Sequence, residues 1–321
     1  MSVSINGTNG LTFNDASTQA TAATGFGFKN RILNGAMMVD QRNAAASQTF
    51  TAAGALAYSV DRWYGYCTGA NVTGQQVAGS TTPTNTQFRY KFTGAASVTA
   101  VGFGQRIEQK NSYDLAGSTC TLSADLAISA TLTTVTWTAY YATTTADTFG
   151  SLASPTVTQI ATGTFTVSAT VTNFSTNISI PAAATTGIQI LFTVGALTAG
   201  LTWTIGNVQL EKGSTATSFD YRPYGTELAL CQRYYEGQDG TSGNRFIISA
   251  PSGTASGIYY NWINLLVQKR IAPTVALTGQ TYNVGNTGSS SNPSISGFLS
   301  QYTVTGTSSY MFSGFTATAE L

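Results

Sequence analysis

Short runs of alternating apolar and polar residues dominate the chain. Residues 134–140 alternate valine, tryptophan and alanine with threonine, and a similar pattern recurs in residues 164–172, 187–195 and 201–205. Because successive side chains of a β-strand point to opposite faces, a period of two predicts strands that bury one face. Gly, Pro and Asn residues separate these runs, which indicates an antiparallel, jelly-roll-like sandwich over residues 29–225.

The two ends of the chain differ from this central region. Residues 1–28 are polar and rich in glycine, so we expect an extended arm that gains order against another surface or another copy of itself. Ile5, Leu11 and Phe13 are its candidate interface residues. Residues 237–321 combine strand patterns with many Ser, Gly and Thr residues, which predicts a smaller C-terminal β module. The whole chain is therefore predicted to be all-β.

One segment between the two β regions has helical spacing. Residues 226–236, with the sequence TELALCQRYYE, place leucine and tyrosine near a helical repeat between Gly225 and Gly237. This pattern predicts a short helical linker. Tyr234 and Tyr235 lie in it, and we expect both at an inter-module or subunit interface because aromatic side chains at helical spacing usually pack.

Charge is scarce in this sequence. Charged residues make up 8% of the chain, against about 25% in ordinary soluble domains. The formal net charge of +1 offers no basic surface for nucleic acid, so we expect none to bind. The first residues lack the basic and apolar regions of a signal peptide, and no run approaches the roughly 18 apolar residues of a membrane helix. We therefore expect no membrane insertion, and we expect the chain to stay in the cytoplasm of the cell that makes it.

The sequence contains no histidine. Its absence removes the nucleophile systems that use a histidine base and also the commonest ligand of transition metals. Carboxylate chemistry is what remains for an enzyme, and no carboxylate motif is evident. We therefore expect no catalytic activity, no cofactor and no bound metal.

Clustered aromatic residues are the candidates for ligand binding. Sugar rings present apolar C–H faces that stack on tryptophan and tyrosine, so exposed rings beside amides favour a glycan site. The candidates are Trp63, Tyr64, Tyr66, Tyr140 and Tyr141. The alternative is core packing, since large aromatic residues dominate sandwich cores.

Three short segments hold a notable share of the few charges. The residues are Asp61, Arg62, Arg106, Glu108, Asp220 and Arg222. We interpret them as ion pairs that tie the first and last strands together, with ligand contact as the alternative. Asn34-Gly35, near the first of these segments, suits a turn or bulge that needs a positive φ.

A set of motifs in fixed order carries a family resemblance. It comprises KNRILNGAMMVDQRN at 29–43, VDRW at 60–63, QRIE at 105–108 and DLAG at 114–117, and it closes with the segment 202–236, which contains CQRYY. Together these motifs resemble a family of tailed-bacteriophage tail-fibre and minor virion structural proteins.

The resemblance implies a carbohydrate-binding-module-like jelly roll, a homotrimer and a place in the virion. Residues 1–28 would then form the trimer stem or attach the protein to other virion proteins of the tail, baseplate or capsid. The function implied is that of a tail fibre that contributes to host-surface glycan binding. A head fibre or capsid decoration protein is the alternative, and a glycan depolymerase is a third possibility that the lack of internal repeats disfavours.

Overall fold

The computed structural model describes residues 28–52, 56–79, 86–129, 131–240, 245–249, 257–282, 288–304 and 310–321, together with the backbone of three short strands nearer the N-terminus. These strands are β1 (Ser4–Asn6), β2 (Gly10–Thr12) and β3 (Thr18–Gln19), which pair in an antiparallel sheet. Phe13 and the side chains of Ile5 and Leu11 lie outside the described residues, so their interface role stays a prediction.

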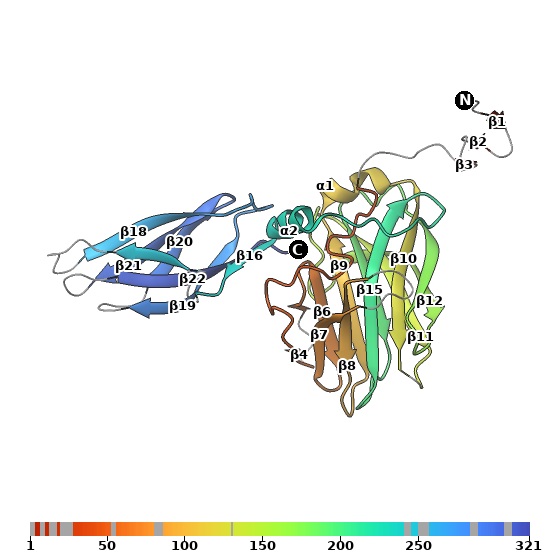
Figure 1. Ribbon diagram of the computed structural model, residues 1–321, viewed down its shortest axis with the longest axis horizontal. Helices are drawn as coiled ribbons and strands as arrows, with labels where there is room; N and C mark the ends of the chain where they lie inside the picture. Colours follow the sequence, from red (N-terminus) through yellow and green to blue (C-terminus); the bar gives the residue numbers. More distant parts are fainter. Residues whose placement is uncertain are drawn as a thin grey trace.

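The central region is a sandwich of two six-stranded antiparallel sheets (Figure 1). The first sheet runs, in spatial order, β13 (Thr172–Ser179), β10 (Thr119–Ile128), β15 (Thr202–Lys212), β8 (Phe88–Thr93), β7 (Val72–Ala78) and β4 (Gln48–Phe50). The second sheet runs β12 (Val157–Thr166), β11 (Thr134–Ala142), β14 (Ile188–Val194), β9 (Ala100–Ile107), β6 (Trp63–Thr68) and β5 (Ala57–Tyr58).

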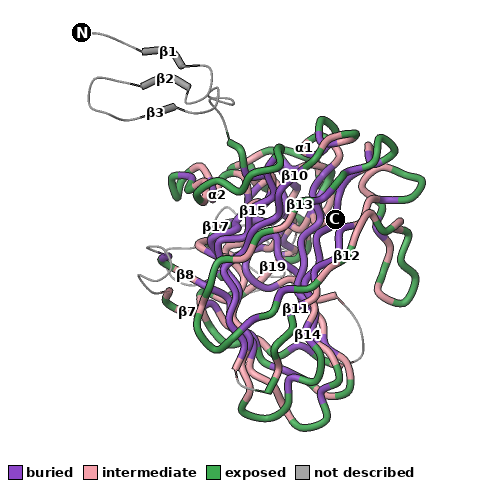
Figure 2. The backbone as a smooth tube through the Cα atoms, turned by 90° about the vertical axis from the view of Figure 1, so that its right-hand side faces the viewer, coloured by how far each residue is buried: buried purple, intermediate pink, exposed green. Residues whose placement is uncertain are grey.

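One large hydrophobic core fills the space between these sheets, and much of the backbone of their central strands is coloured as buried (Figure 2). Aromatic rings form its centre: Trp63 stacks on Phe103 at 4.8 Å, Phe103 stacks on Tyr90 at 4.9 Å, and Phe92 stacks on Trp203 at 5.3 Å. These rings come from strands of both sheets, so their contacts hold the layers together. The predicted all-β sandwich with a short helix and a smaller C-terminal module is confirmed.

Helices are few and short in the described part of the chain. α1 (Gln109–Ser112) and the 3-10 turn η1 (Tyr113–Leu115) follow β9, and α2 (Tyr224–Gln232) follows the sandwich. No helix among the described residues has the length and apolar character needed to span a membrane.

The predicted helical linker over residues 226–236 is shifted in the structure, because α2 starts earlier and ends at Gln232. Tyr235 already belongs to a strand, β16 (Tyr235–Gln238), where it pairs with Thr318. The main-chain oxygen of Tyr234 also accepts a bond of 2.7 Å from Ala319. Strand pairing with the last residues therefore draws both tyrosines out of the helix.

The C-terminal module also has two layers, and it projects from the sandwich beside α2 (Figure 1). In one layer, β22 (Tyr310–Thr318) pairs with β16, β17 (Phe246–Ser249) and β19 (Thr274–Tyr282). In the other, β21 (Gly297–Val304) lies between β18 (Gly257–Asn264) and β20 (Gly288–Ser294).

The core of this module is small, with two clusters of four buried apolar residues each. Its surface is correspondingly apolar. Seven of the eleven exposed large hydrophobic residues of the described chain belong to it, namely Ile247, Ile258, Tyr260, Trp262, Leu266, Ile271 and Ile295. Between residues 29 and 220, by contrast, Tyr113 is the single exposed residue of this kind among those described.

Candidate functional site

Two of the predicted glycan-binding residues, Trp63 and Tyr64, are buried in the structure. Trp63 is 0% exposed, and its Nε1 donates to the main-chain oxygen of Asn34 at 3.0 Å. Tyr64 is 1% exposed, with its ring between the backbone at Gly104 and the edge of Tyr58. Burial also raises the pKa of the Tyr64 phenol far above its ordinary value. The prediction of exposed rings is therefore wrong for these two residues.

Tyr66 and Tyr140 are half-buried on the outer face of the second sheet. The ring of Tyr66 lies against Gly102, since a Cβ at that glycine would be 2.1 Å from the ring. Burial raises the pKa of Tyr66, and the nearby Tyr140 phenol adds to the rise. Two strands, β14 and β9, lie between them in the sheet. Tyr141 points to the other face, where it packs against the core.

We call the exposed part of this outer surface the tyrosine face. It consists of Tyr66, Tyr140, Thr136, Thr162, Thr164 and Thr193. The alternation that buries Val135 and Trp137 turns Thr136, which lies between them, toward the outer face. The tyrosine face therefore offers two aromatic rings beside a row of hydroxyl groups.

The sheet that carries the tyrosine face is nearly free of charge. Arg106 is the only charged residue in its six strands. Its guanidinium is buried and donates three hydrogen bonds within the protein. The acceptors are Gln189 Oε1 at 3.0 Å and the main-chain oxygens of Gly150 at 2.7 Å and Leu321 at 2.8 Å. An ionic ligand would find no counter-charge on this face.

A second candidate site lies where the sandwich meets the C-terminal module. We call it the junction cluster, formed by Arg42, Arg62, Tyr234, Tyr235 and Glu320. Glu320 forms an ion pair with Arg62 and a second one, of 2.9 Å, with Arg42. The guanidinium of Arg62 lies 3.5 Å from the ring centre of Tyr234, and that of Arg42 lies 3.5 Å from the ring centre of Tyr235. The structure thus places Tyr234 and Tyr235 between the two modules.

Glu108 extends the contacts of this region. It pairs with Arg233 at 2.8 Å and accepts a bond of 2.9 Å from the Tyr234 hydroxyl. Burial alone would raise the pKa of Glu108, but hydrogen bonds from Arg233 and Tyr234 outweigh it and keep the pKa below its ordinary value. Glu108 is therefore held as a carboxylate.

None of the six predicted ion-pair residues forms a salt bridge with another of the six. Arg62 lies in the turn before β6 with a positive φ of 73°, and its side chain reaches Glu320. Arg222 pairs with Glu227 at 3.1 Å. Asp220 accepts main-chain N–H groups, and its bond from Lys29 is 2.8 Å.

Asp61 likewise accepts from Gln41 rather than from an arginine. The sequence analysis missed Glu320, Arg42 and Arg233 as partners. The signal in the sequence that could have suggested these partners is the scarcity of charge, since a buried arginine has few acidic residues with which to pair.

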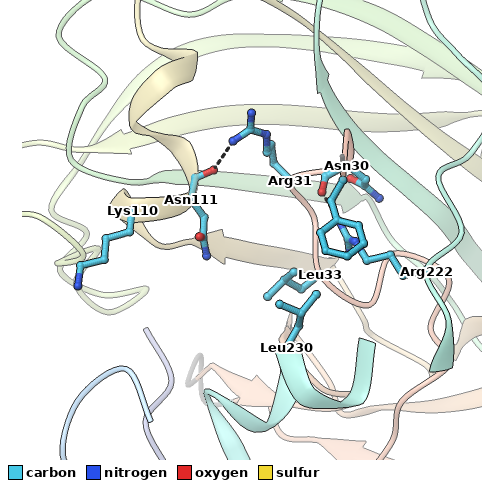
Figure 3. A pocket seen from close by; sticks show the side chains of 8 residues that line it. Asn30, Arg31, Leu33, Lys110, Asn111, Arg222 and Leu230 are labelled. Carbon is cyan, nitrogen blue, oxygen red and sulfur yellow. Dashed lines mark hydrogen bonds between the residues drawn. The ribbon is translucent and has the colours of Figure 1, made fainter. Parts of the chain in front are cut away.

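A pocket of about 180 Å³ lies beside α2. Figure 3 shows Leu33 and Leu230 facing each other and Arg31 donating to the main-chain oxygen of Asn111, a bond of 3.1 Å. Both of its arginines, Arg31 and Arg222, already bind carboxylates. Small-molecule sites usually measure about 300–1,000 Å³, and we assign no ligand to this pocket.

Comparison with known proteins gave structural matches and no sequence match. No protein-family model matches the chain, and neither does any curated protein sequence. One similar solved structure is the enzymatically active domain of tailspike protein 4 of bacteriophage CBA120, with 15% identity and a TM-score of 0.36. The match covers 58% of this chain, which spans only 22% of the tailspike chain.

Carbohydrate-binding modules are also among the similar structures. A CBM4 structure has 14% identity and a TM-score of 0.30, covering 56% of this chain and 98% of its own. The CBM22-2 xylan-binding domain of Paenibacillus barcinonensis has 13% identity and a TM-score of 0.32, covering 47% and 92%. These low TM-scores establish neither a family nor a function, and the resemblance to phage fibre proteins stays a prediction.

Proposed function

We propose that this chain is a non-catalytic glycan-binding protein, and that the tyrosine face is its binding site. The observation that carries the proposal is the combination of half-buried but accessible phenol rings with threonine hydroxyls on a sheet whose single charge, Arg106, is buried. Neutral sugars present apolar C–H faces and hydroxyl groups. The rings of Tyr66 and Tyr140 supply stacking surfaces for the former.

Hydrogen bonding matches the same ligand. A threonine hydroxyl both donates and accepts, as a sugar hydroxyl does, so Thr136, Thr164 and Thr193 can pair with sugar hydroxyls in either sense. The Thr162 hydroxyl already donates to the main-chain oxygen of Trp137 at 3.0 Å and can accept. Stacking on the tyrosine rings would supply affinity for the sugar, and hydrogen bonds to the hydroxyl groups would set its orientation. A neutral or weakly charged polysaccharide is therefore the ligand class.

The absence of catalysis belongs to this proposal. Glycoside hydrolysis requires two carboxyl groups that face the scissile bond. The buried carboxylates Glu108, Glu227 and Glu320 are held in ion pairs away from the tyrosine face. The proposed activity is binding, and incubation with a bound polysaccharide is expected to leave its chain length unchanged.

We further propose that the protein acts as a trimeric tail fibre of a tailed-phage virion that contacts glycans of the host surface. The polar residues 1–28 would join the trimer to other virion proteins. The small core of the C-terminal module and its exposed residues Ile247, Ile271 and Ile295 support association between copies, because contact would cover these three side chains.

A bacterial glycan array tests the binding site. Wild-type protein is expected to give signals on neutral oligosaccharides, and the double variant Tyr66→Ala/Tyr140→Ala is expected to weaken them. Tyr113→Ala is the matched control, because Tyr113 is 60% exposed and lies outside the tyrosine face. Absence of any wild-type signal, or equal signals from wild type and the double variant, would contradict the proposal.

A further inference from the structure

Trp262 is the one exposed tryptophan of the chain. The other three, Trp63, Trp137 and Trp203, are at most 5% exposed, whereas Trp262 is 44% exposed. It lies on β18, an edge strand of the projecting C-terminal module (Figure 1). Tyr260, on the same strand, is 56% exposed. Residues i and i+2 of a strand share a face roughly 6.6 Å apart, so the two rings stand side by side.

The orientation of Trp262 is fixed by its neighbours. Its Nε1 donates to Asn264 Oδ1 at 2.9 Å. A Cβ at Gly297 would lie 2.8 Å from two atoms of the indole ring, so the ring rests against this glycine on the adjacent strand. One side of the indole is therefore covered by the sheet, and its remaining surface is open to solvent.

The surroundings of the two rings are uncharged. Strands β18, β21 and β20 contain no charged residue. Leu299 lies opposite Trp262 in the strand register, and Gln301 lies opposite Tyr260 with Ser289 beyond it. An amide and a hydroxyl thus flank the rings, as in the tyrosine face of the sandwich.

We propose that Tyr260 and Trp262 form a second glycan-binding platform for neutral oligosaccharides. This inference rests on the proposed function and adds a second contact on another module of the same chain. Two linked sites raise the apparent affinity for a polymer without any new type of contact, because the second binding event becomes intramolecular.

The setting of the rings favours a sugar over a second copy of the chain. Preorganisation lowers the entropic cost of binding, and Asn264 and Gly297 already hold the indole in place. An apolar ligand would leave the Gln301 amide without a partner, whereas sugar hydroxyls can bond to it. The platform therefore fits stacking with hydrogen bonds at its rim.

Acrylamide quenching of tryptophan fluorescence tests this platform, because Trp262 is the only tryptophan that acrylamide reaches in the folded protein. The probes are the two neutral oligosaccharides with the strongest array signals for wild type. Either probe is expected to protect Trp262 from quenching. Trp262→Ala and Tyr260→Ala should each weaken binding in a calorimetric titration by about tenfold. Leu266→Ala, which shortens a 77% exposed side chain elsewhere in the module, should not.

Three outcomes are separable. Array signals without protection of Trp262 would overturn the platform and leave the tyrosine face intact. Strong shielding of Trp262 before any sugar is added would show that another copy covers the ring, which also overturns it. A lack of array signals would contradict the proposed function itself and remove the basis of the platform with it.

Discussion

At the scale of single residues, stability depends on buried charge. Glu320 is 4% exposed and Arg62 is 1% exposed, and each is the other's ion-pair partner. The buried Arg62 and the half-buried Arg42 both rely on this one carboxylate. A buried ion whose partner is removed keeps its desolvation cost and loses the compensating attraction.

Replacing Glu320 by alanine is therefore expected to lower the free energy of unfolding by about 3–5 kcal/mol. The matched control is Asp114→Ala, which breaks the pair of Arg31 with the 52% exposed side chain of Asp114. That pair should contribute about 1 kcal/mol or less. Urea denaturation of the two variants measures the difference, and similar losses in both would show that burial of the junction cluster does not govern its energetics.

Asp61 gives the fold a dependence on pH. Burial raises its pKa from 3.8 to about 7, against the opposing effects of Arg42 and Gln41. Between these values the native state keeps a proton that the unfolded chain has released. The native state thus binds more protons, and stability falls as pH rises through this window.

The variant Asp61→Asn lacks this titration. The stability of wild type relative to the variant should fall by up to about 4 kcal/mol between pH 4 and 7 and stay level above that range. Urea unfolding of both proteins across this range checks the trend. A constant difference between the proteins would mean that Asp61 titrates normally.

At the scale of elements, the alternating runs at 134–140, 187–195 and 201–205 correctly predicted strands β11, β14 and β15, whereas the run at 164–172 covers the connection between β12 and β13. The exposed face of each strand was not predictable. Trp63 and Tyr64 point to opposite faces of β6, yet both are buried, because the Tyr64 ring lies against Gly104 and contacts the ring of Tyr58 on the outer face. Alternation assigns opposite faces and carries no information about what covers them. The candidate site was therefore predicted in part, through Tyr66 and Tyr140.

The junction cluster was beyond sequence reasoning for another reason. Arg62 and Glu320 are 258 positions apart. Their contact depends on β22 returning to the sandwich, and no local pattern specifies that path. The turn at Asn34-Gly35 shows a similar limit, because the positive φ of 52° belongs to Asn34, and Gly35 is needed for close approach instead.

Gly35 supports a prediction about how this loop is held. A Cβ at Gly35 would lie 2.2 Å from the main-chain oxygen of Val208 in β15. Gly35→Ala should separate the loop from the sheet and weaken the 3.0 Å bond from Val208 N to Gly35 O, with a loss of about 1–3 kcal/mol. Thermal unfolding measures it.

The control for Gly35 is Gly225, in the first turn of α2, where a Cβ would meet nothing within 4 Å. Gly225→Ala should be neutral or stabilise by up to about 1 kcal/mol, because alanine favours the helix. If both variants unfold like wild type, the loop is not packed against β15 as described.

At the scale of the whole molecule, a sandwich with one large core carries a smaller module that holds most of the exposed large apolar residues described. The proposed trimer would have three times the 33.5 kDa mass of one chain. Native mass spectrometry is expected to detect that species. A monomer at micromolar concentration would contradict the trimer and leave the glycan sites untouched.

Calorimetric titration at two salt concentrations tests the central claim most directly. The titrant is a neutral oligosaccharide selected on the array. The tyrosine face has no exposed charge to screen, so wild-type affinity should agree within about twofold at roughly 0.05 and 0.5 M NaCl. Tyr66→Ala/Tyr140→Ala should lose most of this affinity at both concentrations. Affinity that falls steeply with salt, or that survives the double substitution unchanged, would contradict binding through the tyrosine face.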